Sequence, residues 1–141
     1  MHLAVTKLTP EAKVPTYAHA TDAGMYMYAA AAVTIPAHER VLVSTGIAMA
    51  IPEGYVGLIW DKSGIATKRG VTTLAGVVDA GYRGEVQIAL YNTTEETVTF
   101  AAGEKVAQMV IQPVLQPELI EVDELEQSER GKGGFGSTGT I

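Results

Sequence analysis

The sequence contains no cysteine among its 141 residues. Disulfide bonds and thiol chemistry are therefore excluded. The chain also lacks an uninterrupted run of 18 apolar residues, the minimum for a helix that crosses a membrane. Its first 20 residues do not show the basic-then-apolar layout of a secretory signal peptide. We therefore expect a cytoplasmic protein with no membrane partner.

Basic residues are scarce as well. The chain has 10 Lys and Arg against 16 Asp and Glu, which gives a formal net charge of −6. Proteins that bind nucleic acid polymers generally need a broad basic surface to neutralise the phosphates. We therefore expect no nucleic acid polymer as a partner. Hydrophobic residues make up 47% of the chain, which suits a single domain with a substantial core.

Strand patterns dominate the chain. Several segments alternate apolar and polar residues or concentrate β-branched and aromatic residues, which is typical of strands with one buried face. Turn-forming residues separate them at short intervals. The segments are 2–8, 39–52, 55–60, 84–92, 97–102 and 105–114. This pattern predicts an all-β protein, an antiparallel jelly-roll-like barrel or sandwich.

One segment, residues 63–70, favours a short helix. Ser63 is the expected N-cap, because its hydroxyl can accept a hydrogen bond from an amide of the first turn. Lys68 and Arg69 suit the negative C-terminal end, and Gly70 can cap it. The amides at the start of this helix could bind an anion, although a plain N-cap explains Ser63 equally well.

Three side chains beyond this helix are candidates for chemistry. Asp79 lies in "GVVDAGYRGEV" (76–86), where it could be a general base or an ordinary acidic turn residue. Tyr82 in the same stretch could support a sugar ring or simply pack against the turn. Gln108 lies in an apolar strand, where a buried glutamine would need a partner and an exposed one would face solvent.

The last twelve residues, "RGKGGFGSTGTI" (130–141), are rich in glycine and contain one aromatic residue, Phe135. Glycine loses more backbone freedom on ordering than any other residue, so this segment cannot hold one shape alone. A disordered terminus is the ordinary interpretation of such an end.

The order and spacing of five stretches are more specific than any one of them. These are "DAGMYMYAA" (22–30), "GLIWDKSGIA" (57–66), "TLAGVVDAGYRGEV" (73–86), "GEKVAQMVIQP" (103–113) and "RGKGGFGSTG" (130–139). Together they resemble the five motifs of the trimeric dUTP pyrophosphatases (dUTPases), from about Val14 to Thr140. The resemblance implies a homotrimer with active sites between subunits. It also implies hydrolysis of dUTP to dUMP and pyrophosphate, which removes dUTP from the nucleotide pool and supplies dUMP for dTMP synthesis.

The resemblance implies a role for each candidate in catalysis. Asp79 would activate the water that attacks the α-phosphate, because an ionised carboxylate can accept its proton. Gln108 would help fix that water and contact the α-phosphate. Tyr82 would press its ring against the deoxyribose and leave no room for a 2′-hydroxyl, which would exclude UTP.

The resemblance also implies how the nucleotide is bound. Backbone groups of the hairpin at residues 74–78 would bind uracil, and the start of the helix and the tail would hold the phosphates. In the tail, Phe135 would stack on uracil, and the segment would close over the site as a lid. The substrate-binding residues are then Lys62, Ser63, Gly64, Gly76, Val77, Val78, Tyr82, Arg130, Phe135, Gly136, Ser137 and Thr138.

Magnesium is the cofactor that the resemblance implies, and here the chain departs from the family. The first motif usually reads Ala-Gly-x-Asp, and its acid holds Mg²⁺ through a water; this chain has Tyr26 at that position. Tyrosine cannot replace a carboxylate near neutral pH. Mg²⁺ would then be held mainly by the substrate phosphates. Asp61, where the family usually has proline, is a further candidate to position the metal.

The same motifs divide the chain into three parts. Residues 1–116 would form the β domain, 117–129 an acidic connector, and 130–141 the lid. Three other functions stay open. A dUTP-binding regulator with lost catalysis fits the change at Tyr26, and a purely structural trimer would leave the tail without a purpose. A dCTP deaminase would need a glutamate where this chain has Ala89.

Overall fold

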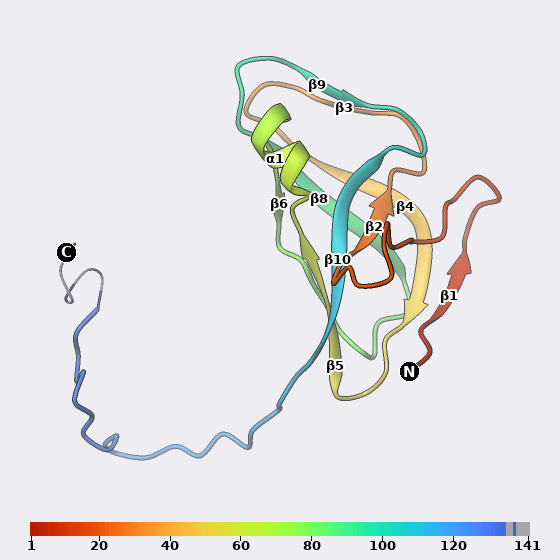
Figure 1. Cartoon of the computed structure of the whole chain (residues 1–141). Coiled ribbons are helices and arrows are strands. Elements are labelled where there is room, and N and C mark those ends of the chain that lie inside the picture. Colours follow the sequence, from red (N-terminus) through yellow and green to blue (C-terminus); the bar gives the residue numbers. More distant parts are fainter. Residues whose placement is uncertain (135–136, 138–141) are drawn as a thin grey trace.

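The computed structural model describes residues 1–134 and 137, and Figure 1 shows this part as a β-sandwich with one short helix. The antiparallel all-β prediction is confirmed. In chain order the elements are β1 (Ala4–Lys7), β2 (Met25–Tyr28), β3 (Val33–Ile35), β4 (Arg40–Ala50), β5 (Tyr55–Trp60), α1 (Ser63–Arg69), β6 (Val71–Leu74), β7 (Val77–Val78), β8 (Glu85–Asn92), β9 (Val98–Phe100) and β10 (Lys105–Pro113).

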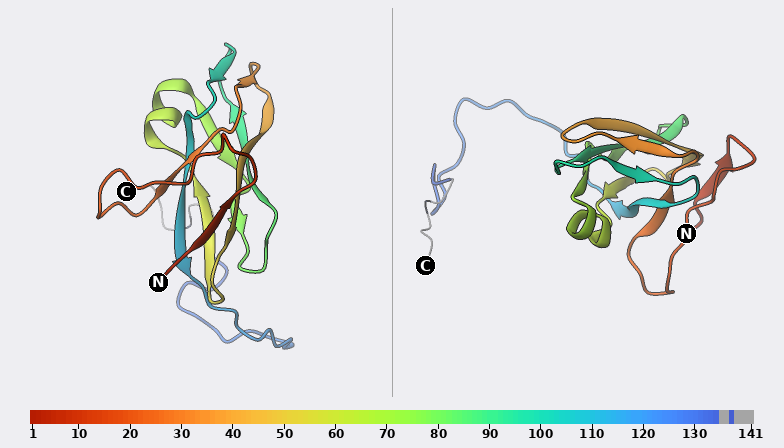
Figure 2. Two further views of the ribbon diagram at one scale, coloured as in Figure 1. Left: turned by 90° about the vertical axis from the view of Figure 1, so that its right-hand side faces the viewer. Right: turned by 90° about the horizontal axis from the view of Figure 1, so that it is seen from above.

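Two four-stranded antiparallel sheets form the sandwich. One has the strand order β1-β4-β8-β6 and the other β2-β10-β5-β7, while β3 and β9 pair at one end (Figure 1). Figure 2 shows the two layers from the side and from above. Apolar side chains of both sheets meet between them, and strands such as β2 and β8 bury alternate residues in this core. The largest fully buried side chains include those of Met27, Ile35, Ile47, Ile88, Leu90, Phe100 and Met109.

A bulge in β10 decides which side chains reach the outer face of the second sheet. Lys105 lies opposite Tyr28 and Gln108 opposite Tyr26, but the register shifts between them. Side chains three apart in a regular strand point to opposite faces, and one extra residue corrects this. Lys105 and Gln108 are accordingly both half-buried on the outer face, whereas Val106 between them is buried.

The six predicted strand ranges correspond to β1, β4, β5, β8, β9 and β10. Strand β7 lies in the hairpin expected at residues 74–78, whereas β2, β3 and β6 lie outside every predicted range. These three have only three or four residues each, so their alternation is too brief to separate from a loop by sequence. Strands β2 and β6 pair with the long strands β10 and β8, and β3 pairs with the equally short β9.

The predicted N-cap of the helix is wrong by one residue. Lys62 is the N-cap, with φ −80° and ψ 117° and without a side-chain capping bond, and Ser63 is the first helical residue. The reason is that the Lys62 carbonyl already accepts the first helical bond, from the amide of Ala66 at 3.0 Å. The C-terminal prediction is confirmed, because Lys68 and Arg69 lie in the last turn and Gly70 is the left-handed C-cap.

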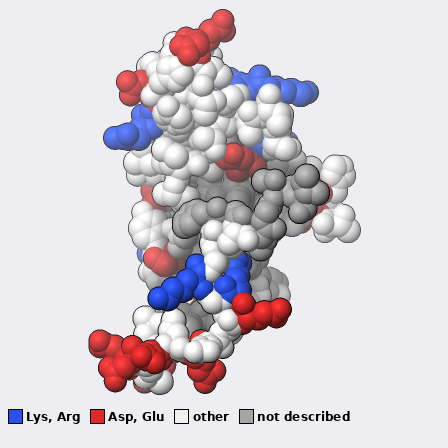
Figure 3. All heavy atoms as spheres, turned by 90° about the vertical axis from the view of Figure 1, so that its left-hand side faces the viewer, with Lys and Arg blue, Asp and Glu red and all other residues white. Residues whose placement is uncertain are grey.

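The surface of the described residues is mixed in charge. Figure 3 shows Lys and Arg side chains interspersed with Asp and Glu over one face. Within residues 1–134 and 137, no helix is long and apolar enough to cross a membrane. After β10 the chain leaves the sandwich, and residues 115–132 are exposed (Figure 1).

Candidate functional site

The hairpin that carries Asp79 is held against the edge of the second sheet. Strand β7 pairs with β5, and the amide of Ile59 donates to the Gly76 carbonyl at 2.8 Å. Gly76 has φ +124°, and a Cβ there would lie 2.8 Å from the Ile59 carbonyl oxygen. Glycine is therefore required by both the backbone conformation and the close approach. Val77, which follows it, is 69% exposed.

Asp79 and Tyr82 form a tight turn beside a hollow. The amide of Tyr82 donates to the Asp79 carbonyl at 3.1 Å, and the Tyr82 hydroxyl donates to the Glu85 carbonyl at 2.9 Å. The hollow, of about 230 Å³, is lined by Val77, Val78, Asp79, Tyr82, Glu85 and Gln87. The structure thus brings together the predicted base, the predicted sugar contact and two residues of the predicted uracil hairpin.

Gln108 lies in the middle of the second sheet, between Tyr26 of β2 and Trp60 of β5. Its Nε2 donates to the Asp61 carbonyl at 2.8 Å. This bond directs Oε1 toward Gly24, where an added Cβ would lie only 2.6 Å from it. Gly24 therefore makes room for the Gln108 side chain. The close approach was not predicted, although Gly24 is part of the first motif.

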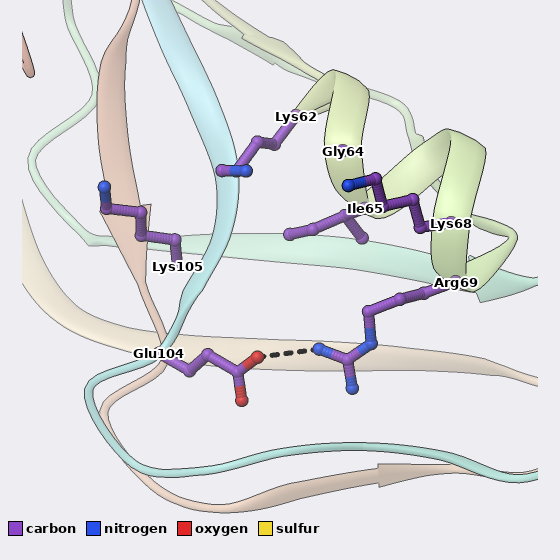
Figure 4. A pocket seen from close by; sticks show the side chains of 7 residues that line it. All are labelled: Lys62, Gly64, Ile65, Lys68, Arg69, Glu104 and Lys105. Carbon is purple, nitrogen blue, oxygen red and sulfur yellow. Dashed lines mark hydrogen bonds and ion pairs between the residues drawn. The ribbon is translucent and has the colours of Figure 1, made fainter.

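Lys62 and Gly64 line a second hollow, of about 350 Å³, beside the start of α1. Figure 4 shows Lys62 reaching from the helix start toward β10 and Lys68 projecting from the helix. We call this the lysine hollow; it is lined by Lys62, Gly64, Ile65, Lys68, Arg69, Glu104 and Lys105. The sequence predicted Lys62 and Gly64 as site residues but not Lys68 and Arg69 of α1 or Lys105 of β10.

The amides at the start of α1 supply further positive potential. Those of Ile65 and Ala66 donate to the Lys62 carbonyl at 2.8 and 3.0 Å. The first amides of a helix have no partner within it, so those of Ser63 and Gly64 are suited to an anion. The predicted phosphate contacts Lys62, Ser63 and Gly64 are therefore contiguous and beside the lysine hollow.

Asp61 has a structural role in this chain. Its carboxylate accepts hydrogen bonds from the Thr73 amide at 2.6 Å, the Thr73 hydroxyl at 2.7 Å and the Thr72 hydroxyl at 2.8 Å. Partial burial raises the pKa of Asp61, but the three hydrogen bonds outweigh it and bring the pKa below its ordinary value. The carboxylate ties the start of α1 to β6, and this does not favour Asp61 as the metal ligand.

Tyr26, at the position of the usual metal-binding acid, contacts a cation. The Nζ of Lys105 lies 3.7 Å from the centroid of its ring. Among residues 1–134 and 137, no group of three His, Asp or Glu side chains is arranged to hold a metal ion. Tyr26 itself therefore offers no carboxylate to a magnesium ion.

One chain does not assemble Asp79 and Gln108 into one site. Val78, next to Asp79, pairs with Gly57, whereas Gln108 pairs with Trp60 on the other edge of β5. Three residues along a strand and two strand spacings separate the backbones of Val78 and Gln108 by about 14 Å. Gln108 borders a third hollow with Gly24 and Tyr26, separate from the one beside Asp79.

The tail residues divide between described and undescribed parts. Arg130 and Ser137 are exposed on the segment that leaves the sandwich, and Arg130 donates through Nε to the Gly133 carbonyl at 2.9 Å. Phe135, Gly136 and Thr138 lie outside the described residues.

Comparison with known proteins matches these features. The dUTPase family model matches residues 10–139. A deoxyuridine 5′-triphosphate nucleotidohydrolase of Candida albicans is 45% identical over 133 residues, covering 93% of this chain and 84% of its own length. Another from Hydrogenobaculum sp. is 46% identical over 142 residues, covering 99% of both chains.

Solved structures agree with the sequence relatives. The dUTPase of Staphylococcus bacteriophage 80alpha, solved with dUPNHPP, has a TM-score of 0.94 and 34% identity and covers 99% of both chains. A mutant dUTPase from phage phi11 of S. aureus, described with a structural Mg(II) ion, has a TM-score of 0.84 and 31% identity, covering 90% of this chain and 100% of its own. Agreement in sequence and in fold along nearly the whole chain shows that this protein belongs to the dUTPase family.

Proposed function

We infer that this protein hydrolyses dUTP to dUMP and pyrophosphate. The observation that carries this conclusion is the family match over residues 10–139, which includes the hairpin with Asp79 and Tyr82 beside a hollow. Relatives along the whole chain are nucleotidohydrolases, and a related structure was solved with a dUTP analogue. The reaction removes dUTP from the nucleotide pool and supplies dUMP for dTMP synthesis.

In the proposed mechanism, Asp79 accepts a proton from the water that attacks the α-phosphate. Its carboxylate lies at an exposed turn, beside residues that can pack on the nucleoside. Gln108 orients the same water: its Nε2 is bound to the Asp61 carbonyl, so its Oε1 can accept a hydrogen bond from the water. Tyr82 supports the deoxyribose with a ring that its own hydroxyl anchors to Glu85.

Magnesium enters this proposal with the substrate. A triphosphate chain can hold Mg²⁺ through its own oxygens, and Mg²⁺ keeps several waters when it binds to proteins. The phi11 relative is described with a structural Mg(II) ion. In this chain Tyr26 and Asp61 do not supply a carboxylate for such an ion, for the reasons given above.

The site is proposed to form between subunits of a homotrimer. The separation of about 14 Å between the backbones of Val78 and Gln108 is too large for Asp79 and Gln108 of one chain to hold the same water. Two copies can bring Asp79 of one to Gln108 of the other. Residues 117–129 would then carry the tail, with Arg130, Phe135, Gly136, Ser137 and Thr138, to a site where it closes as a lid.

The alternatives are not favoured by the comparisons. The relatives are nucleotidohydrolases, which does not support a regulator that has lost catalysis. A deaminase would need a glutamate at Ala89, which lies in β8 opposite Leu42 and Leu74. An alanine there cannot transfer a proton.

Pyrophosphate release from dUTP tests the proposal. UTP, dCTP and dTTP are the controls, each with magnesium and with EDTA. We expect rapid release from dUTP and at least about 100-fold slower release from the others, because a clash or an unpaired polar group excludes them. Tight dUTP binding without release would make the protein a regulator, and ammonia from dCTP would make it a deaminase.

The subunit arrangement has its own test. Asp79→Asn and Gln108→Ala variants, each inactive alone, are mixed under conditions that exchange subunits. If each site takes Asp79 and Gln108 from different chains, about one quarter of the sites in randomly mixed trimers are intact. Recovered activity supports the intersubunit site. Persistent inactivity after proven exchange would place both residues in one chain's site.

A further inference from the structure

We propose that Lys105, positioned by the ring of Tyr26, binds the phosphate chain of the nucleotide, and that its charge takes the place of a magnesium ion held by a carboxylate of this chain. The proposal rests on the proposed function, because it names the group that holds the substrate at one end of the same site. It concerns a residue that sequence reasoning passed over as part of a strand.

The bulge in β10 brings Lys105 to the outer face on which Gln108 also lies. Both residues neighbour β2, where Tyr26 is directly opposite Gln108. Because Gln108 is expected to contact the α-phosphate, a cation a few residues away on the same face is suited to the rest of the phosphate chain. Lys105 therefore lies on the same face of the sheet as Gln108, near the proposed position of the α-phosphate.

The ring of Tyr26 fixes the Lys105 ammonium. The Nζ lies 3.7 Å from the ring centroid, a close cation–π contact. The ring does not neutralise the charge of the ammonium, and the N–H groups that point away from the ring remain available to an anion. Tyr26 is thus a positioning residue: it holds the cation that would contact phosphate.

The lysine hollow, which Lys105 lines on one side, is suited to a polyanion. Lys62 and Lys68 line it together with Lys105; Figure 4 shows Lys62 and Lys68 extending from the α1 side, and Lys105 beyond β10 with its ammonium directed away from α1. Within the part of the chain that the structure describes, the ion pairs engage Arg69 with Glu104 but do not engage these lysines. Several like charges around one hollow repel each other until an anion binds.

The carboxylates near this end of the site already have partners. Asp61 accepts from Thr72 and Thr73. Glu104 accepts from Arg69 at 2.7 Å and from the Ala101 amide at 2.8 Å. A metal ion at either one would compete with these donors for the carboxylate oxygens.

Asp22, in the first motif, is engaged as well. It accepts from the His19 amide at 3.0 Å and lies 3.3 Å from the His19 ring. The group beside Tyr26 is thus the Lys105 ammonium, which can bind phosphate oxygens, while the nearby carboxylates already accept hydrogen bonds.

Binding of the non-hydrolysable analogue dUpNHpp tests the proposal on the full-length protein. Titrations are made with magnesium and with EDTA at equal ionic strength, by calorimetry or by the fluorescence of Trp60, which is the single tryptophan of the sequence and neighbours Gln108. For the unmodified protein we expect dissociation constants that differ by less than about threefold between the two conditions, since lysines supply the charge.

Four variants distinguish the contribution of Lys105 to analogue binding from the contribution of Tyr26. Lys105→Ala and Lys105→Met, which keeps the apolar stem, should each weaken analogue binding by about 10-fold in both conditions. Tyr26→Phe should bind like the unmodified protein, because it keeps the ring. Tyr26→Asp should bind weakly in EDTA and recover by about 10-fold with magnesium, because it pairs with Lys105 and restores a metal ligand.

Lys13→Ala is the matched control. The Nζ of Lys13 lies 5.5 Å from the ring centroid of Tyr28, which is on the same strand as Tyr26. Lys13 does not line the lysine hollow, and its replacement by alanine changes the net charge by the same amount as Lys105→Ala. We expect it to bind the analogue normally.

Two results would overturn the proposal while the hydrolase function stands: analogue binding that falls at least about 10-fold in EDTA, or Lys105 variants that match Lys13→Ala. Failure to bind the analogue in either condition would overturn the proposed function as well.

Discussion

The side-chain amide of Gln108 donates a hydrogen bond to the backbone carbonyl of Asp61, with 2.8 Å between nitrogen and oxygen. This bond joins β10 to the loop before α1 and fixes which end of the glutamine amide faces the hollow beside Gly24. An amide held at one end presents the other in a defined direction, which is what orienting a water molecule requires. The strand register and one loop carbonyl therefore set the geometry of a predicted catalytic group.

Gly24→Ala is expected to reduce kcat by about 10- to 100-fold through this glutamine. A Cβ at position 24 would lie 2.6 Å from Gln108 Oε1 and 3.1 Å from its Cδ, so the side chain must move. Steady-state kinetics with dUTP give the single-variant effect. In a double-mutant cycle, Gly24→Ala should add little to Gln108→Ala, because the affected group is already gone. Fully additive losses would show that Gly24 acts through something else.

Asp79→Asn is expected to lower kcat by about 10³-fold while dUpNHpp still binds. Asparagine preserves the shape of the turn closed by the Tyr82 amide, but it cannot accept a proton from water. Kinetics and analogue titration on the same preparation separate chemistry from binding. Glu118→Gln, a charge-matched change in the exposed acidic connector, is the control. A large loss of analogue affinity with unchanged kcat would assign Asp79 to binding instead.

Deletion of residues 130–141 is expected to lower kcat/KM by about 100-fold or more, because a lid excludes water and completes the phosphate contacts. The thermal midpoint should change by less than about 2 °C, since the packed core ends with β10. Phe135→Leu, which removes the aromatic ring from the full-length chain, should account for part of the loss. Unchanged kcat/KM after deletion would leave the tail without a catalytic role.

Much of the fold was predictable because long strands carry their own pattern. Residues 55–60 are a run rich in β-branched and aromatic residues, and β5 occupies that range. The short strand β2 depends on a partner that is distant in sequence, so a local pattern could not define it. The N-cap error has the same origin, because Ser63 has the right side chain and the backbone of Lys62 begins the helix.

The candidate site residues could be predicted where they lie close together in one motif. They could not be predicted where the fold brings together residues that are distant in sequence. Asp79 and Tyr82 are the first and last residues of one four-residue turn, and both line the same hollow. Lys105 becomes a candidate for the site only once the structure shows the β10 bulge and the contact of its ammonium with the ring of Tyr26. The charge of Asp61 suits a metal ion, but its hydrogen bonds to Thr72 and Thr73 could not be inferred from sequence spacing.

Arg69→Lys is expected to lower the free energy of unfolding by about 1–2 kcal/mol. Arg69 pairs with Glu104 at 2.7 Å, donates to the Thr99 carbonyl, and lies 4.0 Å from the centroid of the Phe100 ring. Lysine keeps the charge but loses the planar fork that makes these contacts together. Urea unfolding measures the change, and Arg40→Lys on the exposed side of β4 is the matched control. Equal effects of the two variants would contradict the assigned role.

Asp61→Asn is expected to destabilise the fold by about 1–2 kcal/mol at pH 7, because the neutral amide cannot accept all three hydrogen bonds of the carboxylate. The folded-state pKa of Asp61 lies below its ordinary value of 3.8, so its contribution to stability is present above that value. It is lost as the pH falls through the folded-state pKa. The difference between the two proteins should therefore shrink below about pH 4.

Urea unfolding at pH 7 and at pH 3, at one protein concentration, measures this dependence on pH. Asp123→Asn in the exposed connector is the control, because its carboxylate lies in solvent and should not change stability at either pH. A loss that is equal at both pH values would mean that the amide disturbs packing and that the charge of Asp61 is unimportant. A loss confined to neutral pH identifies the ionised carboxylate as the tie between α1 and β6, and with it the support for the backbone that holds Lys62 beside the lysine hollow.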